Sequence, residues 1–297
     1  MTISAVPTLH QLLPWQHRFM PWAGGRVHYL DEGPRDAPVL LCLHGFPTWS
    51  LLFRQLIEAL ATDWRILAVD LPGFGCSDAQ PSAPTPRSVT ALLGALLEST
   101  GVDRVHLLAH GLGVRLALDF VARHKDAVGR CAWVNGSATQ VPALGTPWYE
   151  WLLDRQADAR LTALFDDLDT LLPGLMRRMG TGHGFSPATT QMEGYSAVFR
   201  NGSSSEAALR LLEQTDLAPL PQTSGALPAV VSEQPALLVY GGLDRTLDID
   251  AASRELGAAF PHHRSVHLPG VGHFVPEEAG DLLASLLATF LRESEVE

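Results

Sequence analysis

A histidine and a carboxylate near the end of the chain stand where acid–base chemistry is expected. Asp244 lies in "YGGLDRTLD" and His273 in "LPGVGHF", each in a turn that directly follows an apolar run. In open sheets of parallel strands, functional groups collect at the carboxyl ends of the strands. A carboxylate that orients an imidazole makes it a competent general base. We therefore expect His273 and Asp244 to form a catalytic dyad, and we prefer this role for Asp244 to that of a helix cap.

The stretch "LLAHGLGVRLALDF" at residues 107–120 has the layout of a nucleophile elbow, with small residues two positions before and after a central one. The central residue is Gly111, which has no side chain and cannot attack a substrate. Elbow backbones are strained, at a cost of about 1–3 kcal/mol for a residue with a Cβ and almost nothing for glycine. No second G-x-S-x-G pattern or comparable cysteine site occurs. The sequence therefore predicts an elbow, an acid and a histidine in the chain order of a catalytic triad, without the nucleophile.

Alternating strand and helix patterns predict the fold that must position these residues. "PVLLCLHG" is a continuous apolar run, as in a central parallel strand, whereas "RVHYLDEG" alternates as an antiparallel edge strand would. The predicted strands lie within residues 26–33, 38–45, 64–75, 104–111, 129–136, 232–242 and 263–270, and the predicted helices within 50–61, 87–100, 112–124, 248–260 and 277–294. This rhythm predicts an α/β fold with a mainly parallel sheet covered by helices.

The rhythm stops between residues 138 and 222, where helical patterns continue without a convincing strand. Residues 147–179 are rich in aromatic residues and leucine at helical spacing. No linker composition separates this stretch from the rest of the chain. We therefore predict one α/β core made of residues 1–137 and 223–297, with residues 138–222 inserted as a helical cap over a largely apolar pocket.

The composition narrows the possible partners and compartments. A net charge of −11 argues against nucleic acid and anionic membrane surfaces as partners, and no apolar run is long enough to span a bilayer. The N-terminus lacks the pattern of a secretory signal, and Cys42, Cys76 and Cys131 are expected as reduced thiols. No metal-ligand spacing occurs. We therefore expect a cytoplasmic protein without a metal or cofactor, and the sequence leaves its oligomeric state open.

Five motifs together resemble the α/β-hydrolase superfamily, in particular its epoxide hydrolase and haloalkane dehalogenase-like branch. They are "HGFPTWS", "DLPGFGCSD", "AHGLG", "YGGLD" and "GVGHF", spread in this order over nearly the whole chain. The resemblance implies the α/β-hydrolase fold, an eight-stranded, mostly parallel sheet with a helical cap inserted after the sixth strand. It also implies an oxyanion hole made by two backbone N–H groups, that of Phe46 after the first central strand and that of Leu112 after the elbow.

This chain departs from the family pattern at the elbow and beside it. Family members that act on epoxides or halides carry Asp at the elbow, and those that act on esters carry Ser, where this chain has Gly111. Haloalkane dehalogenases usually carry Trp at the position of Leu112 and tend to have Asn at that of Phe46. Both departures argue against dehalogenation.

Four further residues are expected around the substrate pocket: Tyr195, Tyr149, Trp148 and His110. Tyrosines of the cap polarise the epoxide oxygen in epoxide hydrolases, and the resemblance offers Tyr195 and Tyr149 for this role, with Tyr195 the better placed. The structural interpretation, packing in the cap or lining of the pocket, is preferred for both tyrosines and for Trp148. His110, beside the elbow, is expected to be a packing residue.

Three functional interpretations fit a dyad without a nucleophile. In the first, which we favour, the protein is an enzyme that uses His273 and Asp244 as acid and base on a small apolar molecule under the cap. Hydrolysis through water, elimination, cyclisation and C–C cleavage all fit this interpretation. In the second, it is a non-catalytic ligand-binding protein. In the third, Gly111 is a nucleophile-knockout substitution in an epoxide hydrolase or esterase.

Overall fold

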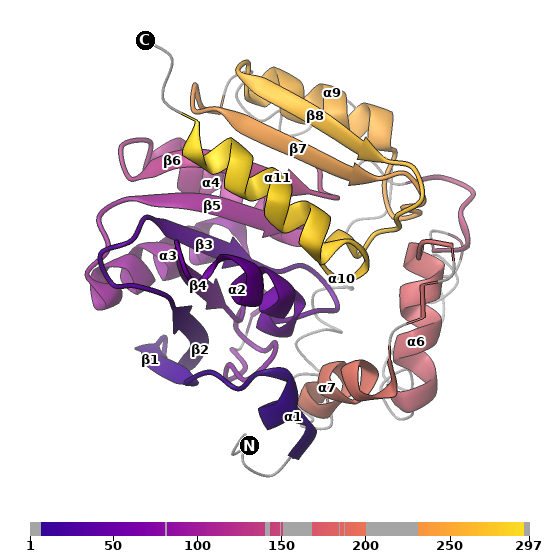
Figure 1. The fold of residues 1–297 in the computed structure, drawn as a ribbon, viewed down its shortest axis with the longest axis horizontal. Coiled ribbons are helices and arrows are strands. Elements are labelled where there is room, and N and C mark those ends of the chain that lie inside the picture. Colours follow the sequence, from indigo (N-terminus) through magenta and orange to yellow (C-terminus); the bar gives the residue numbers. More distant parts are fainter. Residues whose placement is uncertain are drawn as a thin grey trace.

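The computed structural model of the chain describes residues 7–80, 82–139, 143–148, 150, 168–183, 185–186, 188–199 and 231–293. Its centre is one eight-stranded sheet with the strand order β1-β2-β4-β3-β5-β6-β7-β8 (Figure 1). The strands are β1 (Arg18–Trp22), β2 (Gly25–Glu32), β3 (Val39–Leu43), β4 (Arg65–Val69), β5 (Val105–His110), β6 (Val128–Val134), β7 (Ala236–Gly241) and β8 (His263–Leu268). The predicted α/β fold with an eight-stranded, mostly parallel sheet is confirmed.

The parallel part of the sheet runs from β4 through β3, β5, β6 and β7 to β8. Every residue of β3, β4 and β7 is buried. Strands that are covered on both faces read as continuous apolar runs, as the sequence of β3 does. Because parallel strands end at the same edge, the loops after β3, β5, β6, β7 and β8 all open on one side of the sheet.

The antiparallel edge of the sheet is β1, and not residues 26–33 as the alternating pattern predicts. Those residues form β2, which pairs antiparallel with β1 on one side and with β4 on the other. β1 has only five residues, with Pro21 among them, so it gives little periodic signal. Proline is tolerated there because an edge strand leaves one row of its N–H groups unpaired.

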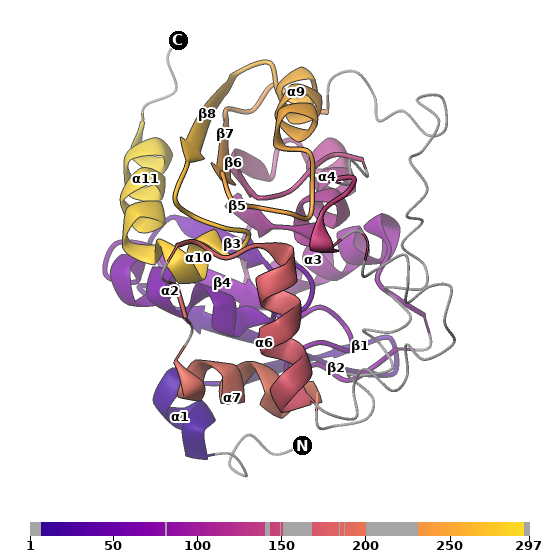
Figure 2. The same cartoon turned by 90° about the vertical axis from the view of Figure 1, so that its right-hand side faces the viewer.

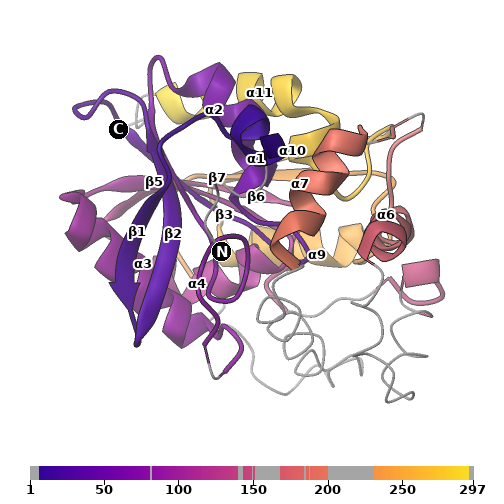
Figure 3. The ribbon, with the colours of Figure 1, turned by 90° about the horizontal axis from the view of Figure 1, so that it is seen from below.

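Helices cover both faces of the sheet. The helical elements are α1 (Pro7–Leu12), the 3-10 turn η2 (Ser50–Phe53), α2 (Arg54–Leu60), α3 (Pro86–Thr100), α4 (Leu112–Arg123), α6 (Leu168–Met179), α7 (Thr189–Phe199), α9 (Ile249–Ala259), α10 (Val275–Glu278) and α11 (Gly280–Arg292). α2 and α11 lie on one face, and α3, α4 and α9 lie on the other (Figures 2 and 3). None of these helices is long and apolar enough to cross a membrane.

The core between the sheet and these helices contains two of the three cysteines. Cys42 on β3 and Cys131 on β6 are fully buried, and Cys76 is partly buried. Burial raises the pKa of all three thiols, so they remain protonated at neutral pH. Free, protonated thiols agree with the expectation from the sequence.

α6 and α7 are the described helices of the predicted cap. They pack against each other, and α7 also packs against α1. They lie at the end of the sheet toward which β7 and β8 run (Figure 1). The described residues between 138 and 199 contain no strand. Residues 140–142, 151–167 and 200–230 lie outside the described residues, so the cap limits of 138 and 222 stay a prediction.

Candidate active site

β5 and α4 meet at a tight turn whose centre is Gly111. Its φ of 56° and ψ of −126° lie in a region that residues with a Cβ reach only under strain. Its N–H donates to Val134 O at 2.9 Å, which ties the turn to the neighbouring strand β6. The backbone of this turn therefore has the form expected of an elbow, with glycine at the strained position.

Two further glycines let the chain pack closely around the elbow. A Cβ on Gly113 would lie 2.5 Å from His44 O, and a Cβ on Gly45 would lie 2.9 Å from Leu112 N. Both separations are below 3.0 Å, so a larger residue would push the loop after β3 away from the elbow. This loop carries Phe46 and lies against the start of α4, where the predicted oxyanion hole requires it. The role of the two N–H groups stays a prediction.

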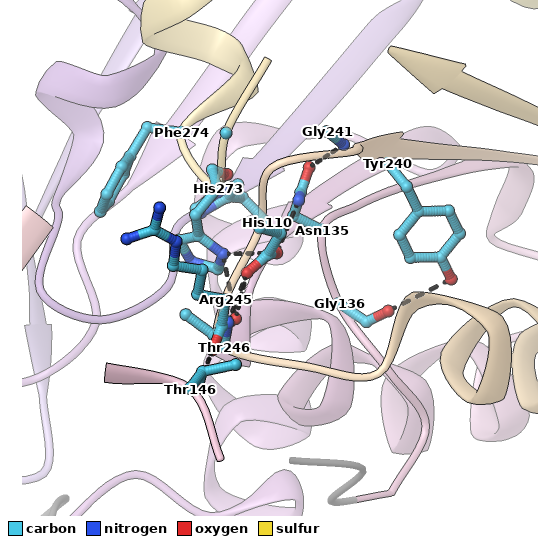
Figure 4. A network of polar contacts seen from close by, with 12 residues as sticks. His110, Asn135, Gly136, Thr146, Tyr240, Gly241, Arg245, Thr246, His273 and Phe274 are labelled. Carbon is cyan, nitrogen blue, oxygen red and sulfur yellow. Dashed lines mark hydrogen bonds and ion pairs between the residues drawn. The ribbon is translucent and has the colours of Figure 1, made fainter. Parts of the chain in front are cut away.

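His273 reaches the elbow from the loop after β8, beside Thr246 and Asn135 (Figure 4). Asp244 supports it from the loop after β7. His273 Nδ1 lies 2.8 Å from Asp244 Oδ2, and both side chains are buried. A Cβ on Gly111 would lie 3.3 Å from His273 Nε2. One ring nitrogen therefore faces the acid, and the other faces the place of a nucleophile's first side-chain atom. The structure brings these residues together, while their catalytic roles stay a prediction.

Hydrogen bonds occupy both carboxylate oxygens of Asp244. Besides His273, Oδ2 accepts from Asn135 Nδ2 at 2.6 Å, and Oδ1 accepts from the N–H and the hydroxyl of Thr246 at 2.7 and 2.8 Å. Burial by itself raises the pKa of Asp244, but the charge of His273 and these hydrogen bonds outweigh it and lower the pKa below its ordinary value. The acid is therefore ionised at neutral pH and holds the Nδ1–H of His273 toward itself.

Asn135 is a residue of this site that no motif in the sequence analysis marked. It follows β6, is fully buried, and has a φ of 46°, which asparagine tolerates better than most residues. Its Oδ1 accepts from the Gly241 N–H at 3.1 Å, which turns the amide nitrogen toward Asp244. The one available signal was an Asn-Gly pair at the carboxyl end of a predicted strand, the same edge that carries the dyad.

Replacing Asn135 by Ala is expected to lower the free energy of unfolding by about 1–3 kcal/mol, because the buried Gly241 N–H loses its partner. The change also removes a hydrogen bond that lowers the pKa of Asp244, so that pKa should rise. Urea unfolding measures the first effect, and NMR titration of the Asp244 carboxyl carbon measures the second. Ser137→Ala, which removes a hydroxyl bonded to the Thr139 carbonyl, is the control in the same loop. An unchanged pKa of Asp244 in Asn135→Ala would contradict the assigned contact.

His110, the last residue of β5, is fully buried beside His273. Its Nε2 lies 2.9 Å from His273 O, and the two rings meet edge to face with centroids 4.8 Å apart. Because a carbonyl only accepts, Nε2 carries the proton, and Nδ1 has no hydrogen-bond partner among the described residues. Burial, followed by the charge of His273, lowers the pKa of His110 to about 3. His110 is therefore a neutral residue that packs on His273 and bonds its backbone.

Stability is expected to fall as the pH drops below about 6.5, in part because of His110. In the unfolded chain His110 binds a proton near its ordinary pKa of 6.5, whereas in the folded chain its pKa is about 3. The unfolded state therefore holds more protons in this window, and one such group lowers the free energy of unfolding by about 1.4 kcal/mol per pH unit. Urea unfolding at about pH 7 and about pH 5 measures the loss. Glutamine does not titrate, so the free energy of unfolding of His110→Gln should depend less steeply on pH than that of the wild type. An equally steep dependence in this variant would contradict a buried neutral histidine at position 110.

Two aromatic residues from the start of the predicted cap were expected at the pocket. Trp148 is buried, and its ring centroid lies 6.5 Å from that of Phe46. The beginning of the predicted cap therefore packs on the loop that follows β3. Tyr149 lies outside the described residues, so its place at the pocket stays a prediction.

Tyr195, on α7, is buried, and its hydroxyl donates to the Glu277 carboxylate. Glu277 lies on α10 and also forms a buried ion pair with Arg54 of α2, with Arg54 Nη2 at 2.7 Å from Oε2. Burial, with the charge of Glu277, raises the pKa of Tyr195 well above its ordinary value. The phenol is therefore a neutral donor to a buried ion pair, which agrees with a packing role. A role in polarising a substrate stays a prediction.

The group of possible metal ligands among the described residues consists of His28, Asp70 and Cys76. The side chains of His28 and Asp70 are already paired: His28 Nδ1 lies 2.7 Å from Asp70 Oδ2, and His28 Nε2 lies 2.8 Å from His17 Nδ1. The Cys76 N–H also donates to Asp70 Oδ2 at 2.8 Å. These contacts give His28 and Asp70 partners within the chain, so the cluster has the character of a scaffold contact.

Comparison with known proteins places this arrangement in a family. Residues 38–279 match the family model described as alpha/beta hydrolase fold. Haloalkane dehalogenase 2 of Mycobacterium tuberculosis is 29% identical, over 97% of this chain and 98% of its own. Epoxide hydrolase 1 of Caenorhabditis elegans is 23% identical, over 94% of this chain and 71% of its own. The crystal structure of Cfl2 from Burkholderia cenocepacia matches with a TM-score of 0.76 and 27% identity, over 93% of this chain and 95% of that one.

The match to the family model covers most of the chain, including the elbow and the loops of His273 and Asp244. The strand order, the elbow backbone and the contact between the two loops agree with it. The protein belongs to the α/β-hydrolase fold family, in the branch that includes haloalkane dehalogenases and epoxide hydrolases.

Proposed function

We propose that this protein is an enzyme that uses His273 as acid and base on a small apolar molecule, without a covalent bond to the chain at any step. The direction of the His273 ring is the observation that carries the proposal. Its Nδ1 is held by Asp244 at 2.8 Å, and its Nε2 lies 3.3 Å from the place of a Cβ on Gly111. The base is thus aimed at a position without a side chain, where water or a group of the substrate can exchange the proton.

Direct hydrolysis illustrates the proposed chemistry. His273 Nε2 takes a proton from water while the water oxygen attacks the electrophilic carbon of the substrate. The bond from that carbon to the leaving oxygen breaks, and this oxygen takes the proton from the imidazolium. Asp244 stabilises the imidazolium between the two transfers. General acid–base catalysis of this kind typically contributes about 10²–10⁴-fold, and N–H groups of Phe46 and Leu112 directed at the oxyanion would add to it.

The proposed substrates are small organic electrophiles. Elimination, cyclisation and C–C cleavage need the same proton transfer as hydrolysis, so the dyad serves each of them. Phe46 is buried on the loop that packs against the elbow, and Trp148 is buried next to Phe46; these aromatic rings favour an apolar substrate. We rank epoxides and small esters first. Haloalkanes rank last, because Leu112 and Phe46 stand where haloalkane dehalogenases carry Trp and Asn.

A substrate panel with one matched variant tests the proposal. Wild-type protein and Asp244→Asn are incubated with alkyl and aryl epoxides, p-nitrophenyl acetate and 1-bromoalkanes, and products are followed by mass spectrometry. We expect the wild type to turn over at least one epoxide or ester, and the variant to be slower by about 10²-fold or more. Binding of panel members measured by calorimetry, with no turnover of any of them, would contradict the proposal and favour a ligand-binding protein.

A further inference from the structure

The end of α6 is bonded to both loops that carry the dyad. Arg245, which follows the acid, donates its N–H to Met179 O at 2.9 Å, and the His273 N–H donates to Gly180 O at 2.9 Å. These two carbonyls belong to the segment 179–182, which leaves α6 within the predicted cap. The backbone of the 179–182 segment therefore holds the backbone of the base and of the residue beside the acid.

The side chain of Glu278 joins the 179–182 segment to the histidine loop. Its Oε2 accepts from the N–H groups of Gly182 and Gly272, and its Oε1 accepts from the Phe274 N–H at 3.3 Å. Gly272 and Phe274 are the residues directly before and after His273. The carboxylate therefore fixes the base through the backbone on each side of it.

Close packing makes this connection specific. A Cβ on Gly272 would lie 2.4 Å from Gly180 O, and a Cβ on Gly182 would lie 2.5 Å from Gly270 O. Glycines at these positions let the two segments approach closely enough for one carboxylate to reach both. Burial, the largest influence, raises the pKa of Glu278, although three backbone N–H groups lower it. The three N–H groups thus offset part of the cost of burying this carboxylate.

We propose that Glu278 is a positioning residue that sets the placement of His273 and couples it to the 179–182 segment. A displacement of α6 is then transmitted through Gly182 and Glu278 to the Nε2 atom that faces Gly111. The inference rests on the proposed function because it takes His273 to be the base. Its test needs no substrate, so the two can fail separately.

Two variants of Glu278 separate the number of acceptors from the reach of the side chain. Glu278→Gln keeps the shape of the side chain but has only one acceptor oxygen. Its NH₂ group must therefore face a backbone N–H that donates to a carboxylate oxygen in the wild type, and that hydrogen bond is lost. Glu278→Asp keeps both oxygens on a side chain one methylene shorter. Glu255→Gln is the control, because Glu255 also accepts a backbone N–H, that of Thr139 at 3.1 Å, but lies on α9.

The readout is the proton NMR signal of the His273 Nδ1–H, which reports the hydrogen bond to Asp244 Oδ2. In Glu278→Gln we expect its exchange with water to accelerate by about ten-fold or more, because the backbone around the ring loses a fixed contact. Glu278→Asp should show a smaller acceleration, and Glu255→Gln none. Each variant is measured at the same interval below its own Tm, so that a loss of global stability does not contribute.

An unchanged exchange rate in Glu278→Gln would overturn the proposal, whatever the Tm of that variant. If Glu278→Gln does not fold, Glu278→Asp decides in the same way, since faster exchange in a folded protein supports the proposal. Failure of both variants to fold would assign Glu278 to fold stability alone and overturn it. A wild type without turnover would contradict the proposed function and leave this result unaffected.

Discussion

Replacing Gly111 by Asp is expected to add a covalent route for epoxide hydrolysis, at a rate at least about 10²-fold above that of direct hydrolysis by the wild type. The new Cβ would lie 3.3 Å from His273 Nε2, so a carboxylate oxygen would stand beside the base. That oxygen attacks the epoxide carbon, the ring C–O bond breaks, and the alkoxide takes a proton from water, which leaves the β-hydroxy ester of the new carboxylate and a hydroxide that the later ester hydrolysis neutralises. His273 then takes a proton from water, whose oxygen attacks the ester carbonyl and releases the diol.

Gly111→Ala and Gly111→Ser are the matched variants for this experiment. Any residue with a Cβ must adopt the strained φ of 56° at this position. Each substitution should therefore lower the free energy of unfolding by about 1–3 kcal/mol, which thermal melts measure. We expect Ser to raise esterase activity on p-nitrophenyl acetate above that of the wild type, and Ala to raise neither activity. A folded Gly111→Asp variant without epoxide turnover would show that the surroundings of the elbow do not support covalent catalysis.

Replacing His273 by Ala is expected to lower the kcat of the wild type by about 10²-fold or more, because one imidazole performs both proton transfers. KM should change less, since the imidazole is proposed to move protons and not to bind the apolar part of the substrate. Initial rates on the best member of the substrate panel measure both constants. His267→Ala, which removes an exposed histidine on β8, is the control and should retain activity.

His273→Ala combined with Gly111→Asp gives a second readout. The ester with the new carboxylate should still form, but water is no longer activated, so the ester accumulates. The intact protein should then gain the mass of one substrate molecule in mass spectrometry. Undiminished kcat in the His273→Ala variant of the wild type would refute the dyad as the catalytic group.

The meeting of Asp244 and His273 was predictable from chain order and strand ends. In a parallel sheet, the loops after β7 and β8 must open at the same edge, so no knowledge of side-chain packing was needed. The elbow at Gly111 was predictable because the small residues in "AHGLG" mark a local turn between a strand and a helix. Both predictions depend on local patterns joined by a simple topological rule.

The groups that hold the dyad were not predictable in this way. Asn135 meets Asp244 across 109 residues, and Gly182 meets Glu278 across 96. Hydrogen bonds between such distant residues form no periodic pattern and depend on backbone positions that exist only in the folded chain. The limits of the cap depend on residues beyond those described. The short strand β1 was missed because five residues that include a proline carry little periodicity.

Acid–base catalysis at Gly111 without a covalent intermediate is tested most directly by a single turnover in water labelled with oxygen-18. Wild-type protein in excess over its best epoxide or ester substrate is mixed in labelled water, and the masses of the product and of the intact protein are measured. Direct attack by water predicts that the product carries the label in this first turnover and that the protein mass is unchanged. An unlabelled product, label in the protein, or a protein mass raised by the substrate would contradict it.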